Sequence, residues 1–472
     1  MFERLEATRT LTANQWRIIA AAILGDMLEF FDYFLIGFVL AFIIGPWQLN
    51  FGQSAIILLS SGIGAILGAA VWGRLADRIG RRAVFIGTVL NFSVATGVLA
   101  MTPDHGWVFL TIFRFFVGFG VGGLYCVDLP LVQEFMPASK RGFVGGLVTA
   151  FIPAGVLLGS VLGAFLAPVV GWRGLFAVGL VPALLCLLIR AWVPESPRWL
   201  VRMGRPEEAR RSLAWALQVP PETLPLPIIN EEATRPARWT ELFHYPRSLL
   251  VSWLSNLGMQ TTGYGVILWA PTLFVLQLGV TPARAAFLFI FVSLAGLVGR
   301  FVFSILSETI GRRAAGALQG FGAAAMVLGA GLLHDQYLGA VSVFWLLIVA
   351  ADFFFDGGSA IMGPYAAEVW PSKLRTSGMG SAYGFGGIGK IIGPIGLALI
   401  VGSSNIVKPE VTIAAIVPSF IYLAAWSALA GIAYAFIGFE TKGRSIEQID
   451  AQLAAGREKR AAAALVRAAG RA

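Results

Sequence analysis

The sequence predicts an all-α membrane protein in which twelve transmembrane helices form two pseudo-symmetric six-helix bundles, and three observations lead to this prediction. Hydrophobic residues make up 57% of the 472-residue chain and charged residues only 13%, whereas a soluble domain carries about 25% charged residues. Apolar segments of about 20 residues or more, long enough to cross a bilayer as a helix, recur along the chain. Charged motifs of the first half also recur in the second half.

The predicted spans fall into two sets of six. The first set lies near residues 14–44, 52–76, 83–102, 106–133, 143–168 and 173–193. The second set lies near residues 248–275, 283–306, 314–333, 339–367, 377–402 and 411–438. The polar leader at 1–17 has no small-residue cleavage site after it, so we expect no removable signal peptide. These spans predict an amino-terminal bundle at 1–193, a cytoplasmic linker at 194–247, a carboxy-terminal bundle at 248–440 and a cytoplasmic tail at 441–472.

Three charged motifs show that the second half of the chain is a copy of the first. Glu, Pro and Arg have the same spacing in Glu134-Phe-Met-Pro137-Ala-Ser-Lys-Arg141 and in Glu368-Val-Trp-Pro371-Ser-Lys-Leu-Arg375. Two further pairs are the runs at 77–82 and 308–313, and those at 194–198 and 440–444. Partners are separated by roughly 231 to 245 residues, which indicates an internal duplication. A duplicated membrane protein usually binds its ligand between the two halves, and this is typical of transporters.

Positively charged residues predict the orientation of the chain. Lys and Arg concentrate in the loops that follow the even-numbered spans, whereas the opposite loops hold only Arg173, Arg284 and Lys408. Because positive loops stay in the cytoplasm, both termini are predicted to be cytoplasmic. The net charge of +9 then comes from these loops and the tail, which argues against a nucleic-acid partner. Cys126 and Cys186 lie within spans, so we expect no disulfide framework.

Ionisable side chains inside the predicted spans mark a candidate functional site, because a charge at bilayer depth is costly. We identify six carboxylates and two cations there: Asp26, Glu29, Asp32, Asp128, Asp352, Asp356, Arg114 and Lys390. So many like charges cannot all ionise together, so some of the carboxylates must be protonated. This surplus favours proton coupling over simple facilitated diffusion.

Asp32 and Arg114 are the preferred proton-coupling pair. A carboxylate that approaches and leaves an arginine during a conformational cycle would gain and lose its proton, because burial and the guanidinium act on it in opposite directions. A fixed structural salt bridge is the alternative role for this pair. Glu29 is an alternative proton carrier. Asp26, which lies closer to the cytoplasm, is expected to be half-exposed or to serve a gate.

Lys390 is the residue that bears most directly on the substrate. A buried ammonium needs a counter-charge, which a substrate carboxylate or phosphate could supply. A permanent pair with Asp352 or Asp356 is the alternative. The remaining candidates for lining a substrate site are Gln260, Tyr264, Tyr383, Asp128 and Tyr125. The three histidines have no metal-ligand spacing, so the sequence predicts neither a metal nor a cofactor.

Several motifs resemble those of the major facilitator superfamily. Gly73-Arg-Leu-Ala-Asp77-Arg-Ile-Gly80-Arg81-Arg82 is similar to its signature between helices 2 and 3. Pro194-Glu-Ser-Pro-Arg-Trp-Leu200 and Phe439-Glu-Thr-Lys-Gly-Arg444 are similar to sugar-porter-type signatures. Helix 7, however, lacks the Gln-Gln pair and the Asn of sugar porters. Glu29-Phe-Phe-Asp32 and the segment from Tyr264 to Pro271 are more similar to the metabolite and aromatic-acid proton symporters.

The resemblance implies the major facilitator fold and assigns a gating role to the loop motifs. Ion pairs among these motifs would hold the cytoplasmic side closed in one state and break in the other, although a static role in ordering the loops is the alternative. The implied gating residues are Gly73, Asp77, Arg81, Glu134, Arg141, Glu195, Arg198, Glu308, Arg312, Glu368, Arg375 and Glu440. Family members that are sugar porters also use an Asp and an Arg at the positions of Asp32 and Arg114.

We expect secondary active transport by alternating access. The transporter would carry protons in symport with a small organic anion, such as a monocarboxylate or an aromatic acid. Phosphate, a zwitterion, an organic cation and a sugar are the alternative substrates, and a non-transporting membrane sensor is a further alternative. The sequence contains no set of nucleophile, base and orienting residue, so it does not predict an enzyme. We expect a monomer in contact with membrane lipid, in the inner membrane of a bacterium.

Overall fold

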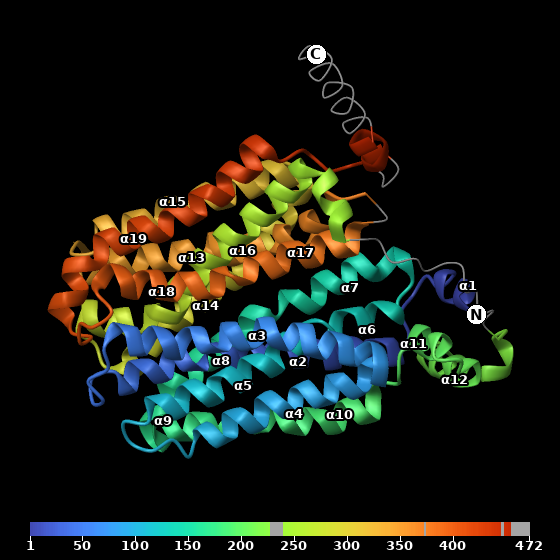
Figure 1. Cartoon of the computed structure of the whole chain (residues 1–472), viewed down its shortest axis with the longest axis horizontal. Coiled ribbons are helices and arrows are strands. Elements are labelled where there is room, and N and C mark those ends of the chain that lie inside the picture. Colours follow the sequence, from blue (N-terminus) through green and yellow to red (C-terminus); the bar gives the residue numbers. More distant parts are fainter. Residues whose placement is uncertain (227–238, 372–373, 445–447, 455–472) are drawn as a thin grey trace, which may run out of the picture. The chain divides into compact units, whose positions relative to one another are not determined.

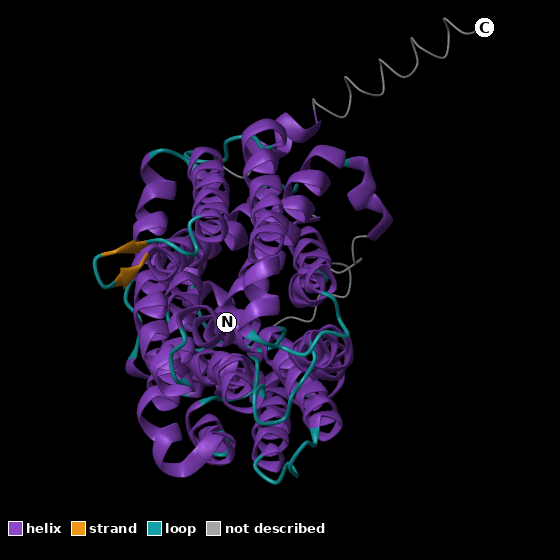
Figure 2. Cartoon of the chain, turned by 90° about the vertical axis from the view of Figure 1, so that its left-hand side faces the viewer, coloured by secondary structure: helices purple, strands orange, loops and turns teal. Residues whose placement is uncertain are grey.

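The computed structural model describes residues 1–226, 239–371, 374–444 and 448–454, and nearly all of them are helical (Figure 2). A short antiparallel hairpin pairs β1 (Tyr337–Leu338) with β2 (Val341–Ser342). The chain divides into two compact units. The first consists of Met1–Ala233, Ile267–Leu294 and Pro394–Ala415, and the second of Thr234–Val266, Ala295–Gly393 and Ile416–Ala472. The domain boundaries expected at 193, 247 and 440 remain predictions.

Helices of the first sequence half belong to the first unit. Their bounds are α1 (Phe2–Glu6), α2 (Ala13–Ile43), α3 (Phe51–Ile79), α4 (Arg81–Leu99), α5 (Trp107–Tyr125), α6 (Asp128–Glu134), α7 (Ala138–Ala150), α8 (Ile152–Val161), the π-helical η1 (Leu162–Leu166), α9 (Ala167–Val178), η2 (Val181–Leu184), α10 (Leu185–Trp192), α11 (Pro197–Arg202), α12 (Pro206–Leu217) and η3 (Pro221–Thr223).

Helices of the second sequence half form most of the second unit and lend some ends to the first. Their bounds are η5 (Trp239–His244), α13 (Pro246–Leu278), α14 (Pro282–Thr309), α15 (Arg312–Leu332), α16 (Val343–Glu368), α17 (Arg375–Gly387), α18 (Gly389–Val401), α19 (Pro409–Ile432) and the π-helical η7 (Ala433–Ile437).

These helices confirm the predicted all-α membrane fold. Within the described residues, ten helices are long and apolar enough to cross a membrane. One of them, Ser139–Leu184, has 46 residues, which at about 1.5 Å per residue is more than twice the thickness of a bilayer core. It breaks at Gly171, whose φ of 74° is a left-handed conformation that favours glycine. α2 has spanning length too, although it carries Asp26, Glu29 and Asp32.

Local sequence explains where the first two spans begin. The Thr12 side chain accepts a hydrogen bond from the backbone of Gln15, and the Gln15 side chain accepts one from the backbone of Thr12. Asn50 and Gln53 make the same reciprocal contacts at the start of α3. Each such capping box satisfies backbone donors that an apolar helix would otherwise leave without acceptors.

Glycines let α3 and α5 pack backbone against backbone in the first unit. A Cβ added at Gly118 or Gly122 would lie 1.9 or 2.0 Å from a carbonyl oxygen of α3. In return, a Cβ at Gly64 or Gly68 would lie 2.1 or 2.0 Å from a carbonyl oxygen of α5. Small residues allow this close approach in membrane helices.

The ends of α13, α14 and α18 that belong to the first unit pack there against α2 and α3. The backbone N–H of Phe51 donates to Asn405 O at 3.0 Å, and the N–H of Val407 donates to Leu49 O at 3.0 Å. Trp269 stacks on Phe51 with ring centroids 5.7 Å apart and is fully buried. The ring therefore fills the contact between two helices.

A small subdomain lies beyond the ends of the spanning helices, where α1 meets α11 and α12 (Figure 1). Leu5 is fully buried there, among Trp199, Leu213 and Leu217. Asn14 Nδ2 donates to Trp215 O at 2.7 Å, which ties the start of α2 to the end of α12. The end of the predicted tail, residues 455–472, lies outside the described residues.

Candidate functional site

The first-half loop motifs meet in one cluster, the first loop cluster, formed by Arg81, Glu134, Glu195 and Ser196. Arg81 Nε lies 3.1 Å from Glu134 Oε1. Glu195 Oε1 accepts hydrogen bonds from the backbone N–H groups of Arg81 at 3.0 Å, Arg82 at 3.1 Å and Ser196 at 2.8 Å. Ser196 Oγ also contacts a Glu134 carboxylate oxygen. A carboxylate therefore occupies the N-terminus of α4, where the helix dipole favours negative charge.

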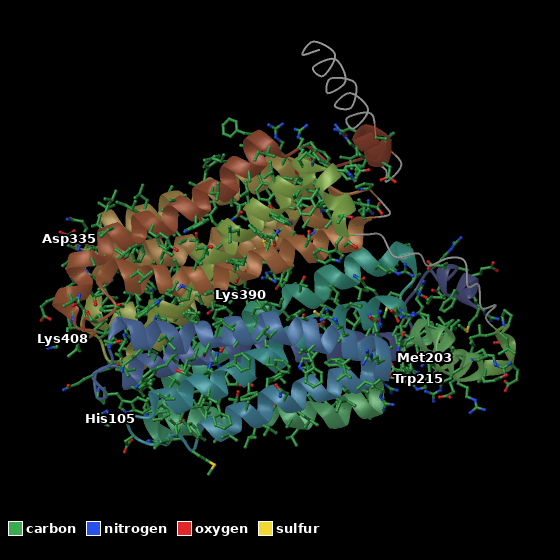
Figure 3. The ribbon with its side chains drawn as sticks, in the orientation of Figure 1. His105, Met203, Trp215, Asp335, Lys390 and Lys408 are labelled. Carbon is green, nitrogen blue, oxygen red and sulfur yellow. The ribbon has the colours of Figure 1, made fainter. Side chains whose placement is uncertain are left out.

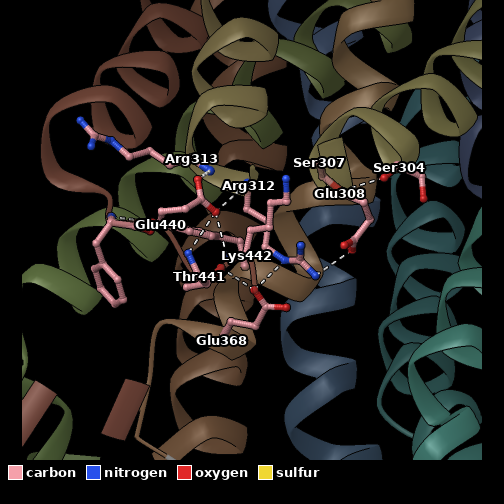
Figure 4. Close-up of polar contacts among 11 residues, drawn as sticks. Ser304, Ser307, Glu308, Arg312, Arg313, Glu368, Glu440, Thr441 and Lys442 are labelled. Atoms are coloured by element: carbon pink, nitrogen blue, oxygen red, sulfur yellow. Dashed lines mark hydrogen bonds and ion pairs between the residues drawn. The ribbon is translucent and has the colours of Figure 1, made fainter. Parts of the chain in front are cut away.

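The second-half motifs form a matching cluster, the second loop cluster, shown in Figure 4. Arg312 lies between two carboxylates, with Nε 2.6 Å from Glu368 Oε2 and Nη2 3.0 Å from Glu308 Oε1. Thr441 Oγ1 donates to Glu368 Oε2 at 2.6 Å. This arrangement repeats the contacts of Arg81, Glu134 and Ser196 in the first cluster, as the repeated spacing predicted.

Glu440 takes the place of Glu195 in the second cluster. Its Oε1 accepts from the backbone N–H groups of Arg312, Thr441 and Lys442, each within 3.0 Å, and its Oε2 accepts from that of Arg313 at 3.1 Å. Four backbone donors therefore converge on this one carboxylate.

Two glycines make room for these carboxylates. Gly80 and Gly311 have φ of 104° and 98°, values that side chains rarely adopt. A Cβ at Gly80 would lie 2.3 Å from Glu195 Oε2, and one at Gly311 would lie 2.4 Å from Glu440 Oε2. The glycine in each loop motif is thus explained both by backbone conformation and by space.

Four residues expected in the gates lie outside the two loop clusters. Arg141 Nη2 pairs with Glu6 Oε1 of α1 at 2.9 Å, and its Nε donates to backbone carbonyls of 133 and 136. The Arg198 guanidinium lies 5.0 Å from the Phe2 ring centroid. Asp77 is 3.9 Å from Arg202, and both side chains are exposed. Two guanidinium nitrogens of Arg375 have no hydrogen-bond partner among the described residues.

Gly73, the remaining residue of the gating set, lies on α3, where a Cβ would meet nothing within 4 Å. The gating role of the whole set remains a prediction.

Arg114 is fully buried and donates to backbone oxygens of α2. Its two terminal nitrogens lie 2.8 Å from Asp32 O and 2.6 Å from Tyr33 O. The Asp32 side chain is fully buried, and neither of its carboxylate oxygens has a hydrogen-bond partner among the described residues. The pair expected from the sequence is therefore close in space, but the fork of the guanidinium is satisfied by carbonyl groups. The sequence identifies the two charged residues, but it does not show which atoms accept the hydrogen bonds of the guanidinium.

The other carboxylates of α2 are buried as well. Asp26 and Glu29 are each 2% exposed, so the expectation of a half-exposed Asp26 was wrong. Asp26 lies close to the carboxyl of Asp128, at the start of α6. Two carboxyl groups that lie this close away from water do not both ionise readily.

Lys390 lies between two tyrosine rings in the second unit, about midway along the helices and away from Asp335, which precedes β1 (Figure 3). Its Nζ is 4.9 Å from the centroid of the Tyr264 ring of α13 and 5.5 Å from that of the Tyr383 ring of α17. Lys390 is 8% exposed and Tyr264 is 5% exposed. A glycine at 389 lets this turn of α18 approach α13, because a Cβ there would lie 2.6 Å from Thr261 N.

Asp352 and Asp356 of α16 lie beside Arg300 of α14. Arg300 Nη2 is 2.8 Å from Asp356 Oδ1, and both side chains are largely buried. Sequence reasoning counted two buried cations and missed this third one. The signal was present, because position 300 is a basic residue inside the apolar span predicted at 283–306.

The remaining predicted site residues are placed as follows. Gln260 of α13 is 5% exposed and lies one turn before Tyr264, on the same face. The Tyr125 side chain lies outside the described part of the structure. The described residues contain no group of three potential metal ligands.

Comparisons with known proteins identify the class of this chain. The family described as Sugar (and other) transporter matches residues 18–453. The niacin transporter NiaP of Acinetobacter baylyi is 32% identical over 385 residues, covering 79% of this chain and 84% of that protein. A putative niacin/nicotinamide transporter of Bacillus subtilis is 28% identical, covering 81% and 88%.

Solved structures show the same fold. The inward-open xylose transporter XylE from E. coli matches with a TM-score of 0.71 at 20% identity, covering 93% of this chain and 99% of that chain. These relatives and neighbours are transporters and not enzymes. The chain belongs to the sugar (and other) transporter family and is a transporter of the major facilitator superfamily.

Proposed function

We propose that this transporter carries a small aromatic monocarboxylate together with protons, by alternating access, across the inner membrane of a bacterium. Both termini would lie in the cytoplasm. The observation that carries the substrate class is Lys390, a buried ammonium between the rings of Tyr264 and Tyr383. The names of two relatives support it, because one is a niacin transporter and the other a putative niacin/nicotinamide transporter, and niacin is a pyridine carboxylic acid.

The chemistry of this group suits such a substrate. Removing an ammonium group from water costs free energy, and a carboxylate that pairs with it offsets this desolvation cost. The two rings stabilise the cation by about 0.5–2 kcal/mol, and they offer faces on which an aromatic acid can stack. Gln260, one turn from Tyr264, would supply a neutral hydrogen bond. Asp128 and Tyr125 are retained as candidate lining residues, whereas the substrate contact expected for Asp352 and Asp356 stays a prediction outside the proposed cycle.

Proton coupling is proposed from the buried carboxyl groups of α2. Asp32, close to Arg114, and Glu29 are the candidate carriers. In the proposed cycle the outward-facing site takes up a proton and the acid, charge neutralisation permits occlusion, and both are released on the cytoplasmic side. The loop clusters around Arg81 and Arg312 would set the balance between the two states.

A matched pair of ligands tests the role of Lys390. Nicotinate and nicotinamide share a ring and differ in having a carboxylate or a neutral amide. In proteoliposomes with an imposed pH gradient, we expect labelled nicotinate to accumulate, while phosphate, betaine and xylose do not. Lys390→Ala should weaken nicotinate binding by roughly 10- to 100-fold, the value of one charge-assisted hydrogen bond, and change nicotinamide binding far less.

Lys408→Ala is the control, since it removes the same charge from an exposed loop. If Lys390→Ala binds nicotinate as well as the native protein does, Lys390 does not meet the carboxylate and the substrate class is wrong. Uptake of a cation or a sugar, but of no acid, would have the same consequence.

A further inference from the structure

Three buried charged side chains of the second unit form a cluster that the proposed cycle does not use. Asp352 and Asp356 lie one turn apart on α16, so they share a face. Arg300 of α14 pairs with Asp356 at 2.8 Å. Asp352 is 6% exposed, and its carboxylate accepts no hydrogen bond within the part of the chain that the structure describes.

Gly296 shows that both carboxylates point at one place. It lies one turn before Arg300 on α14. A Cβ added at Gly296 would be 2.4 Å from Asp352 Oδ2 and 2.7 Å from Asp356 Oδ2. The two oxygens are therefore closer to each other than the sum of these distances, and only a glycine leaves space for both. The helix surface at this point is a cradle for two acidic groups.

The charge of the cluster does not balance without a further positive charge. Asp356 and Arg300 are the charged groups that act on Asp352 among the described residues. Two carboxylates and one guanidinium leave a net charge of about −1 in an apolar bundle. Two adjacent carboxylates away from water do not both ionise readily, and such a pair usually shares one proton.

We propose that Asp352 is a proton-binding site of this transporter, held in place by the Asp356–Arg300 ion pair and by Gly296. On protonation, the Asp352 carboxylate becomes a carboxylic acid and the cluster becomes neutral. On release of the proton to water, Arg300 is left to neutralise two carboxylates at once. This inference deepens the proposed function, because it assigns the second half of the chain a site for the coupled ion.

The proton itself can be observed without any substrate. In an infrared pH titration of the purified full-length protein, the C=O band of a carboxylic acid should appear and disappear with pH. We expect Asp352→Asn to remove one such titrating band and Asp352→Glu to retain it at a shifted position. Asp335→Asn, in the exposed turn before β1 of the same unit, should remove only signal that titrates near the ordinary aspartate pKa of about 3.9. An unaltered titration in Asp352→Asn would overturn the proposal.

Transport provides the second readout, with labelled nicotinate as the probe. Asp352→Asn should lose gradient-driven accumulation, so that uptake stops at equilibration, while exchange of internal for external nicotinate continues. Loss of both activities would make Asp352 a substrate or structural contact and would refute its role as a proton site. Retention of gradient-driven accumulation would refute it too. If the native protein carries no nicotinate, the proposed function fails, and the infrared titration still decides the fate of the proton site.

Discussion

Replacing each loop-cluster glutamate with glutamine separates charge from hydrogen bonding, and the structure predicts unequal effects at the two sites. Glu195 receives its three backbone hydrogen bonds on Oε1 alone. A glutamine oxygen in that position keeps all three, so Glu195→Gln loses only the negative charge at the start of α4. That charge is worth about 0.3–1 kcal/mol at a helix N-terminus.

Glu440 differs because both of its oxygens accept backbone hydrogen bonds. In Glu440→Gln, the amide oxygen can replace Oε1, but the NH₂ group then faces the backbone N–H of Arg313, which donates to Oε2 at 3.1 Å. The variant loses that bond as well as the charge. A hydrogen bond to a charged group is worth about 1.5–3 kcal/mol, and we take the low end because Arg313 N is exposed. The total loss is then about 2 kcal/mol.

Thermal unfolding of the purified protein in one detergent measures the difference. We expect Glu440→Gln to lower the unfolding temperature clearly more than Glu195→Gln does. Glu195→Ala and Glu440→Ala are the controls. Each removes every side-chain acceptor, so each should lower the unfolding temperature more than the corresponding glutamine variant does. Equal shifts for the two glutamine variants, or a larger shift for Glu195→Gln, would refute the assignment of bonds to individual oxygens.

Three further predictions concern packing and surface charge. Gly118→Ala places a Cβ 1.9 Å from a backbone carbonyl of α3 and should cost about 1–3 kcal/mol, seen as a lower unfolding temperature, whereas Gly146→Ala has no neighbour within 4 Å and should be neutral. Leu5→Ala should cost about 2–5 kcal/mol of docking energy and speed protease cleavage of the amino-terminal segment; an unchanged rate would show that α1 is not held by its core contact. The hydrogen bond and charge of Arg173 lower the pKa of the exposed Asp104 carboxyl, so this ion pair stabilises the protein above the ordinary aspartate pKa of about 3.9 and the stabilisation disappears as the pH falls through the lower folded-state value. The difference in unfolding temperature between the native protein and Asp104→Asn should therefore vanish in acid, and a difference that persists there would contradict this origin.

The parts of the fold that could be predicted are those set by local sequence. A run of apolar residues has to satisfy its backbone internally in a membrane, so length and hydropathy identify the helices. The loop clusters were predictable because the motifs repeat at one spacing, and Arg312 does pair with Glu368 as its counterpart Arg81 pairs with Glu134.

The parts that could not be predicted depend on long-range contacts and on the choice of acceptor atom. Glu6 lies 135 residues from Arg141, and no local pattern connects them. Arg300 is a single charge in a long apolar helix, and only the fold reveals that it faces Asp356. For Arg114, the sequence indicated a carboxylate partner, whereas the guanidinium donates to two carbonyl groups.

The two buried arginines are held in different ways, and the difference bears on where charge can move. Arg114 binds the backbone of α2 through both terminal nitrogens, so it can leave only if helix carbonyl groups lose their partners. Arg300 binds a side chain, which can rotate, and a second carboxylate lies next to it. A guanidinium that binds backbone carbonyl groups is held in a fixed position. A guanidinium that binds one of two adjacent carboxylates can change partner when a proton binds or leaves. Protonation would therefore change the contacts of Arg300, in the second half of the chain, at a smaller energetic cost than the contacts of Arg114.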